Sequence, residues 1–180
     1  MENSIEYHLG KVFEIAESKF GVSDPLDKCK YRELITAQEL GHYLFDGASG
    51  GKFNDATYGA DATDENGTKV EYKSARVTAT QYHKFLKGTL KKKYSMVYNG
   101  AYDHASIARY RNIRHILSLF YKEKLVMSVE VPTDYVIETL TKNLEYDNAR
   151  RAKGEIVTTN CNSVGVQIDH NVPTIGVVLS

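Results

Sequence analysis

The stretch Tyr58-Gly-Ala-Asp-Ala-Thr-Asp-Glu-Asn-Gly-Thr-Lys-Val-Glu-Tyr-Lys-Ser74 decides the fold, because its residues alternate with a period of two on both sides of a turn signal. The turn signal, Asp-Glu-Asn-Gly at residues 64–67, suits a type I turn followed by a glycine in the left-handed region. Such a sequence is typical of a three-residue hairpin loop with a G1 bulge. This turn pairs Asp64 with Thr68 and thereby sets the register of both strands.

This register sorts the side chains of the hairpin onto two faces. One face carries three pairs: Asp61 opposite Glu71, Thr63 opposite Lys69, and Gly59 opposite Lys73. The other face carries two apolar pairs, Ala60 with Tyr72 and Ala62 with Val70. We expect the apolar face to be the core face. A one-residue change of the pairing register would place Asp61 on that face beside Val70 and Tyr72.

Asp61 and Glu71 are the chemically informative pair. Opposed residues in an antiparallel pair lie about 5 Å apart, so two carboxylates repel unless a cation lies between them. Mg²⁺ suits such a pair, because it takes one or two carboxylates and fills its other positions with water and phosphate. Lys73, two residues along the strand, could position a metal-activated water or stabilise developing charge. The three residues predict phosphodiester hydrolysis; the alternative is an ordinary exposed hairpin face of alternating charge.

The rest of the chain predicts a single α+β (mixed α/β) domain, residues 1–180, with helices around one central sheet. Apolar residues at helical spacing predict helices over residues 5–20, 31–45 with a break at Gly41, and 133–144 with Thr133 as the cap. We expect a loop over residues 45–55 and a helical turn over residues 106–114. Strands are expected over residues 57–77, 95–98 and 156–179, and a hairpin over 116–131.

Composition favours an ordinary folded protein of one domain, with 42% apolar and 26% charged residues among 180. The N-terminal residues lack a signal-peptide pattern, and no stretch approaches a membrane span. Cys29 and Cys161 have no metal-ligand spacing, so we expect free thiols and a cytoplasmic location.

Positive charge is concentrated although the formal net charge is zero. Between Lys69 and Lys93 eight basic residues accompany one acid, Glu71. A local excess of this size can neutralise several DNA phosphates, although an isolated lysine run is more often a solvated face. Its position directly after the acidic pair favours DNA.

At these residues the chain resembles the PD-(D/E)xK nuclease superfamily, most closely the small type II restriction endonucleases. Asp61 is followed ten positions later by Glu71-Tyr72-Lys73, and Ser74-Ala75-Arg76 continues the likeness. Ala60 stands where the motif has its proline. The resemblance implies that Asp61 and Glu71 bind Mg²⁺, with the Tyr72 carbonyl as a further ligand, and that Lys73 helps to activate water. It also implies 5′-phosphate and 3′-hydroxyl products, and a helical glutamate near the metal, for which Glu33 and Glu39 are both candidates.

The DNA-contacting residues are expected just after the catalytic strand. The candidates are Arg76, Thr78, Thr80, Gln81, Lys84 and Lys87, with the run Lys91, Lys92, Lys93 as phosphate contacts and Arg150, Arg151, Lys153 as a second basic cluster. Arginine pairs with guanine and glutamine with adenine, so Arg76 and Gln81 are the candidate base readers. Tyr82, Tyr94, Tyr98 and Tyr102 are expected to pack in the core or its rim rather than to stack on bases.

Three functions remain open at this point. The first is a homodimeric type II restriction enzyme, which cuts a palindrome in double-stranded DNA and works with a DNA methyltransferase. The second is a structure-selective nuclease of the same fold, such as a Holliday-junction resolvase or a repair nuclease. The third is a DNA-binding module without catalysis, for which clustered acids facing phosphate would be unexpected.

Overall fold

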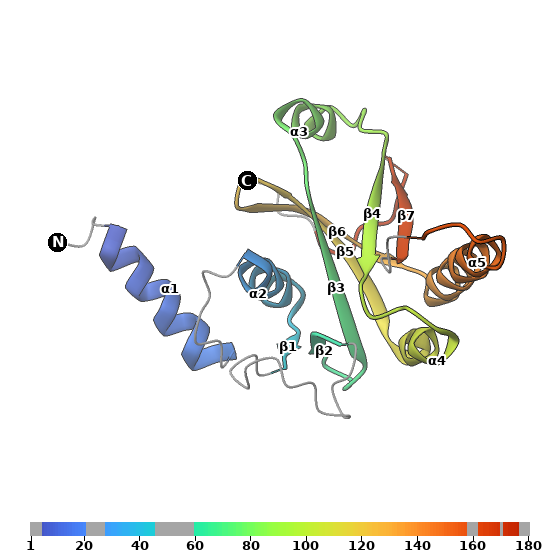
Figure 1. Ribbon diagram of the computed structural model, residues 1–180. Coiled ribbons are helices and arrows are strands. Elements are labelled where there is room, and N and C mark those ends of the chain that lie inside the picture. The colour runs from blue at the N-terminus through green and yellow to red at the C-terminus, as the bar shows by residue number, and fades with distance from the viewer. Residues whose placement is uncertain (1–4, 21–27, 46–59, 158–161, 170, 177–180) are drawn as a thin grey trace.

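The computed structural model describes residues 5–20, 28–45, 60–157, 162–169 and 171–176. The expected α+β architecture is confirmed (Figure 1). In chain order the elements are α1 (Ile5–Phe20), α2 (Lys28–Leu40), β1 (Tyr43–Leu44), β2 (Ala62–Thr63), β3 (Lys69–Arg76), α3 (Ala79–Leu86), β4 (Lys92–Tyr98), α4 (His104–Ala108), a 3₁₀ turn (Arg109–Asn112), β5 (Arg114–Tyr121), β6 (Lys124–Val131), α5 (Thr133–Ala152) and β7 (Asn162–Ile168).

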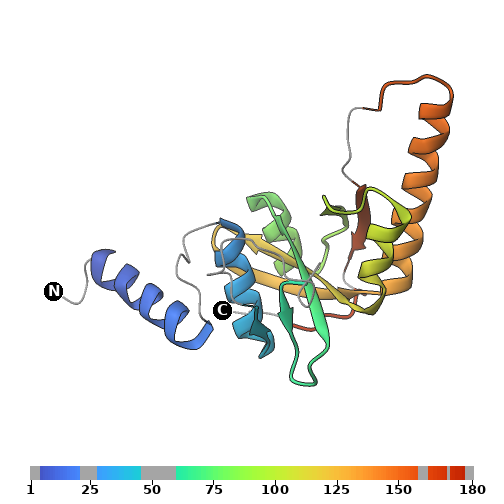
Figure 2. The same ribbon diagram turned by 60° about the horizontal axis from the view of Figure 1, so that its bottom comes forward.

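Two sheets organise the described residues. The larger has the order β1-β2-β3-β5-β6, in which β3 and β5 run parallel and the other neighbours antiparallel. The smaller is the antiparallel pair β4–β7. In Figure 1, β4 lies beside β3. Figures 1 and 2 show α2 and α5 on opposite sides of the molecule, with α5 next to β7. The expected single central sheet is therefore accompanied by a separate two-stranded layer.

Both faces of the large sheet are covered. On the α2 side a small cluster joins Ala37 to Ala62, Val70, Tyr72 and Ile116. On the opposite side a larger cluster contains buried residues of β4, β5, β6, α5 and β7, among them Tyr98, Leu117, Leu119, Leu140 and Val164. The expectation that the Glu71 face lies away from the core is wrong, because the β4–β7 pair and α5 pack on that side.

The predicted turn of the hairpin between β2 and β3 is confirmed, and its register is confirmed as far as Ala62. Ala62 pairs with Val70 and Thr63 with Lys69, while the Asp64 N–H donates to the Thr68 carbonyl at 2.9 Å. Gly67 has φ +77°, the left-handed conformation that the turn requires.

Beyond Ala62 the predicted ladder does not continue. The backbone bends at Asp61, whose N–H donates to the Val70 carbonyl at 2.8 Å and whose carbonyl accepts from Phe45 N–H at 2.9 Å. Ala60 consequently packs against the larger cluster instead of pairing with Tyr72. The predicted partner of Lys73, Gly59, lies outside the described residues, as do 46–55 of the expected loop.

Most of the other predicted elements are found, with shifted ends. The first helix is confirmed, and the second ends at Leu40, before Gly41 with φ +69°. The hairpin β5–β6 and the helical turns after residue 103 are confirmed. The helix from Thr133 extends to Ala152 rather than 144, and Pro132 rather than Thr133 is its N-cap; the Thr133 hydroxyl donates to the Ile113 carbonyl at 2.9 Å.

Helix α3 is an element that the apolar pattern did not predict. Thr78 and Gln81 form a reciprocal capping box at its N-terminus. None of its residues is buried, and its attachment includes the Tyr82 ring, which stacks on Tyr121 with centroids 4.3 Å apart. The helix therefore projects from the end of β3 with its basic residues exposed.

Among the described residues, no helix is both long and apolar enough to cross a bilayer. The Cys29 side chain and Cys161 lie outside the described part of the chain.

Gly67 and Gly10 give a matched test of the hairpin conformation. A Cβ at either position would meet nothing within 4 Å, but only Gly67 has positive φ. We expect Gly67→Ala to lower the free energy of unfolding by about 1–2 kcal/mol, because the left-handed conformation strains a side chain. Gly10→Ala, inside α1, should raise it by about 0.5–1 kcal/mol. Urea denaturation measures both; equal effects of the two substitutions would contradict the assigned turn.

Candidate active site at the open edge of β3

Asp61 lies where the edge of β3 loses its strand partner. Because β2 begins only at Ala62, the Tyr72 N–H meets a side chain instead of a strand, and it donates to Asp61 Oδ2 at 2.7 Å. A buried backbone N–H needs such an acceptor. The bend at Asp61 thus brings its carboxylate to β3 beside Glu71, although the two residues are not ladder partners.

Glu71 and Lys73 point from β3 toward the β4–β7 layer. Glu71 is buried, and its Oε1 accepts a hydrogen bond from Lys73 Nζ. Lys73 Nζ also lies 5.1 Å from the centre of the Tyr98 ring, within the range of a cation–π interaction. The structure therefore brings Asp61, Glu71 and Lys73 together, as the sequence predicted.

Behind Lys73, the buried side chain of His115 fixes the Tyr98 ring. His115, the β5 neighbour of Glu71, is fully buried, and its Nε2 lies 3.2 Å from the Tyr110 carbonyl. That nitrogen must donate, so Nδ1 accepts from the Tyr98 hydroxyl at 3.0 Å. Burial lowers the pKa of His115 to about 4, which keeps the ring neutral and able to accept at neutral pH.

The electrostatics are those of crowded, buried carboxylates. Burial raises the pKa of Asp61 well above its ordinary value, and the charges of Glu71 and Glu33 add to this, whereas Lys73 and the Tyr72 N–H oppose it. Burial likewise raises the pKa of Glu71 against the opposing effect of Lys73. Burial acts to lower the pKa of Lys73, but Glu71 and Asp61 outweigh it and the pKa is raised. Lys73 therefore stays protonated and serves as a cation and hydrogen-bond donor, not as a base.

A cleft of about 240 Å³ opens beside these residues. One wall is α2, with Arg32, Glu33 and Thr36; the floor is β3, with Tyr72, Lys73 and Ser74; Ser95 and Val97 of β4 form the other wall. Ser118 of β5 completes the lining and accepts from the Thr36 hydroxyl at 3.1 Å. The cleft exists because the edge of β3 is open between α2 and β4.

Of the two candidate helical glutamates, Glu33 belongs to this site. It lines the cleft, raises the pKa of both Asp61 and Glu71 by its charge, and accepts from Lys30 Nζ at 2.8 Å. Glu39 is exposed, and its side chain lies near Gly176. Although both glutamates belong to α2, only Glu33 faces the cleft.

Arg32 is a cleft residue that the sequence did not single out. Its Nη1 donates to Ser74 Oγ at 3.3 Å, its guanidinium lies 5.6 Å from the centre of the Phe120 ring, and its Nε is buried without a hydrogen-bond partner. An unsatisfied buried donor on a cation is a natural ligand for phosphate. The helical spacing of apolar residues in the sequence could not identify Arg32 as a cleft residue.

The expected DNA-contacting residues lie around α3, at the end of β3. Arg76, Thr78, Thr80, Lys84, Lys87 and the run Lys91, Lys92, Lys93 are exposed. Gln81 Oε1 accepts the Thr78 N–H in the capping box, and Arg76 lies 3.7 Å from Glu123. The second basic cluster is at the far end of α5 (Figure 2), where Arg150 pairs with Glu155 at 2.7 Å. Tyr94 and Tyr98 are buried as expected, whereas Tyr102 is exposed.

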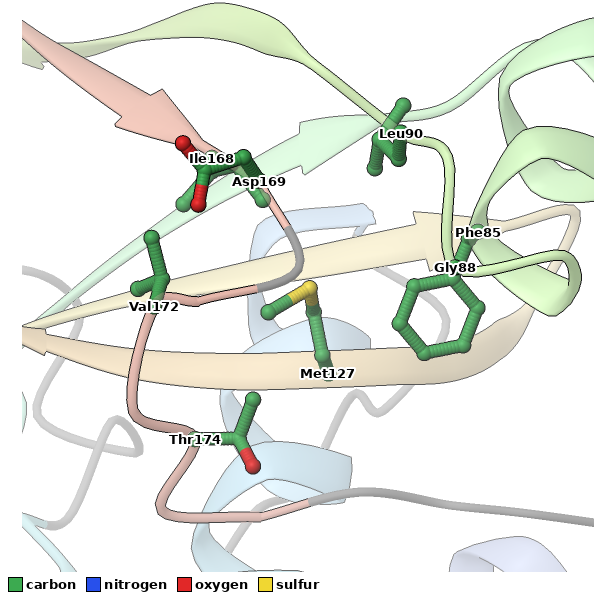
Figure 3. Close-up of a pocket in the computed structure, with 8 residues that line it drawn as sticks. All are labelled: Phe85, Gly88, Leu90, Met127, Ile168, Asp169, Val172 and Thr174. Atoms are coloured by element: carbon green, nitrogen blue, oxygen red, sulfur yellow. The ribbon is translucent and has the colours of Figure 1, made fainter.

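A second hollow, of about 200 Å³, lies between α3 and the end of β7 (Figure 3). Phe85, Leu90, Met127, Ile168 and Val172 make it largely apolar. Its acid, Asp169, accepts the Asn171 N–H at 2.9 Å in a local turn. This hollow offers packing space beneath α3 rather than a set of reactive groups.

The donor set at β3 fits a hard divalent cation. The described residues contain no group of three or more metal-ligating side chains, so such a cation would rest on Asp61 and Glu71 and retain water. Two adjacent carboxylates, Glu71 buried and Asp61 half-buried, whose pKa values are raised are the groups that a cation would stabilise. Comparison with family models and with curated proteins finds no match to this chain.

Asp61 should destabilise the metal-free protein. Its pKa is raised in the folded state, so ionisation above that pKa costs stability, and this cost disappears as the pH falls and the carboxyl becomes protonated. We expect Asp61→Asn to raise the free energy of unfolding at pH 7.5 by on the order of 1 kcal/mol, since it removes like-charge repulsion at short range. The gain should shrink toward pH 4. Denaturation in EDTA at both pH values measures it; a loss of stability at pH 7.5 would contradict the repulsion.

Proposed function

We propose that this chain is an Mg²⁺-dependent endonuclease that hydrolyses phosphodiester bonds of double-stranded DNA at a specific sequence. The observation that carries the proposal is the grouping of Asp61, Glu71 and Lys73 at an open strand edge that borders a cleft. Two acids and one protonated lysine supply both metal ligands and a cation for phosphoryl oxygen.

The cleft walls favour a phosphodiester over a neutral substrate. Arg32 and Lys73 present cationic groups to the same cleft. Exposed lysines continue from it along α3 and into β4, and the sequence from Ser74 to Tyr102 contains no acidic residue. A backbone that carries one charge per phosphate matches this distribution.

The residues divide the reaction between them. Bound Mg²⁺ would polarise the phosphoryl oxygen and lower the pKa of a coordinated water. Asp61 and Glu71 would hold that ion, and the Tyr72 N–H keeps the Asp61 carboxylate oriented. Lys73, held between Glu71 and the Tyr98 ring, donates to the attacking water or to a phosphoryl oxygen. The water gives its hydroxyl to phosphorus as the bond to the 3′ oxygen breaks. The proton that the water loses passes through solvent to the 3′ oxygen, which leaves a 3′-hydroxyl and a 5′-phosphate.

Cleavage of both strands of a palindrome needs two such sites related by two-fold symmetry. We infer that a homodimer supplies them, and that a methyltransferase protects the same sequence in the cell.

Isosteric substitutions test the three residues without opening cavities in a buried site. Asp61→Asn, Glu71→Gln and Lys73→Met should each reduce cleavage of plasmid DNA by at least about 10²-fold, because each removes a ligand or the donor. Lys142→Met and Glu138→Gln, both exposed on α5, are the controls and should cut like the unaltered chain. Gel assays of initial rates decide this; normal cutting by Glu71→Gln would remove that residue from the site.

Metal dependence gives a second test. Cleavage should require Mg²⁺ or Mn²⁺ and stop in excess EDTA. Because a ligand that binds the folded state stabilises it, Mg²⁺ at about 100 times its dissociation constant should add about 2.7 kcal/mol to the free energy of unfolding. Asp61→Asn should lose most of that increment. Cutting that continues in EDTA, or an equal Mg²⁺ effect on both proteins, would contradict the assigned ligands.

A further inference from the structure

The β4–β7 pair presents one face to the core and one to the outside. Tyr94, Met96, Tyr98, Val164 and Ile168 point inward and are buried. The alternate positions form three outer cross-strand pairs, Lys93 with Gln167, Ser95 with Gly165, and Val97 with Ser163. We call these six residues the outer ribbon face; five of them are exposed and Gly165 is partly buried. None of the six is acidic.

This outer ribbon face is continuous with the catalytic cleft. Ser95 and Val97 belong to both, and the same cleft contains Lys73. A duplex whose backbone lies in the cleft therefore has its grooves next to the ribbon. In Figure 1, β4 lies between β3 and β7, so the ribbon extends away from the catalytic strand on one side only.

We propose that the outer ribbon face enters the major groove of duplex DNA and reads base edges, with Lys93, Ser95 and Gln167 as the principal determinants of sequence preference. This inference rests on the proposed function for its substrate and adds the surface that recognises it. The major groove, about 12 Å wide, admits a two-stranded antiparallel ribbon. From Lys93 to Val97 the strand rises about 13 Å, which spans about four base-pair steps.

The side chains of the ribbon have the chemistry of base readers. The Gln167 amide can pair bidentately with adenine, Lys93 with guanine, and Ser95 with either, while Val97 offers an apolar surface to a thymine methyl group. Gly165 leaves room for Lys93 to lie across the ribbon: a Cβ there would be 2.0 Å from Lys93 Cε. The lysine is thereby directed toward the middle of the face.

The β7 edge of the ribbon is held by two hydrogen bonds from α5. The Tyr135 hydroxyl donates to the Gly165 carbonyl at 2.7 Å, and Asn143 Nδ2 donates to the Ser163 carbonyl at 2.9 Å. Helix α5 thus seals the β7 edge that β4 does not cover. Base contacts from a fixed scaffold discriminate better than contacts from loops.

By contrast, the basic residues of α3 are arranged as phosphate contacts. Lys84 is exposed on a helix without buried residues, Lys87 is exposed at the C-cap of that helix, and Gln81 is occupied by the capping box. Phosphate contacts position a duplex but carry no sequence information. The two surfaces therefore predict different consequences of substitution.

The test is a binding selection with the full-length chain. The Asp61→Asn variant is incubated with duplexes that carry a randomised segment, and bound duplexes are separated by gel shift and sequenced. Lys93→Ala, Ser95→Ala and Gln167→Ala are compared in that background with Lys84→Ala, Lys87→Ala and the distant Lys142→Ala. Unchanged melting temperatures establish that each variant is folded.

We expect Lys93→Ala, Ser95→Ala and Gln167→Ala each to lose about 10-fold of the preference at one base pair while the other positions are kept. Lys84→Ala and Lys87→Ala should weaken binding to all duplexes alike and lower the salt slope, and Lys142→Ala should change neither. The same enriched sequence with all three ribbon variants, an unselective pool, or no bound duplex would each overturn the inference.

Plasmid cleavage by the unaltered chain in Mg²⁺ separates this inference from the proposed function. Cutting with a preference that the ribbon variants leave unchanged would reject the ribbon alone. A ribbon-dependent binding preference without cutting would reject the hydrolysis alone.

Discussion

The hydrogen bond from the Tyr72 N–H to the Asp61 carboxylate is the contact on which the site depends. It forms because β2 begins only at Ala62 and leaves the rest of the β3 edge without a strand. An open edge is usually a liability, since unpaired N–H and C=O groups invite another strand. Here α2 and β4 flank the edge from the two faces of the sheet, so the exposed groups border a narrow cleft. One short strand thus creates both the carboxylate position and the space in front of it.

The same arrangement places charge where folding does not favour it. Burial raises the pKa values of Asp61 and Glu71, Glu33 adds to both, and the charge of Glu71 adds to the shift of Asp61. A chain of three contacts offsets part of this cost: Lys73 donates to Glu71, the Tyr98 ring faces Lys73, and neutral His115 holds Tyr98. His115 restricts Tyr98, and Tyr98 restricts Lys73, so the Lys73 ammonium group is preorganised. Such local cost at a site is tolerated when the rest of the core stabilises the fold.

The sequence predicted what local chemistry determines and missed what distant contacts determine. The turn at residues 64–67 and the first two pairs of the hairpin followed from the residues themselves. The bend at Asp61 depends on a hydrogen bond from Phe45, which no local pattern contains. The pairing of β4 with β7 joins segments about 70 residues apart, so alternation suggested strands but not partners. Helix α3 escaped because it has no buried face, although the Thr78–Gln81 capping box was a signal that could have found it. Glu33 was separable from Glu39, and Arg32 recognisable, only once α2 had been placed against β3.

Because side chains alternate along β4, this strand connects the cleft on its outer face with the surroundings of Lys73 on its inner face. Val97 lines the cleft on the outer face, and the next residue, Tyr98, carries the ring that faces Lys73 on the inner face. Because consecutive residues of a strand move together, a ligand that presses on the outer face also acts on the ring that faces Lys73. A correctly seated duplex would hold β4 in the position that keeps Tyr98 against Lys73, whereas a poorly seated one would not receive the same support. The proposed recognition surface and the support of the Lys73 ammonium group therefore lie on one strand, β4.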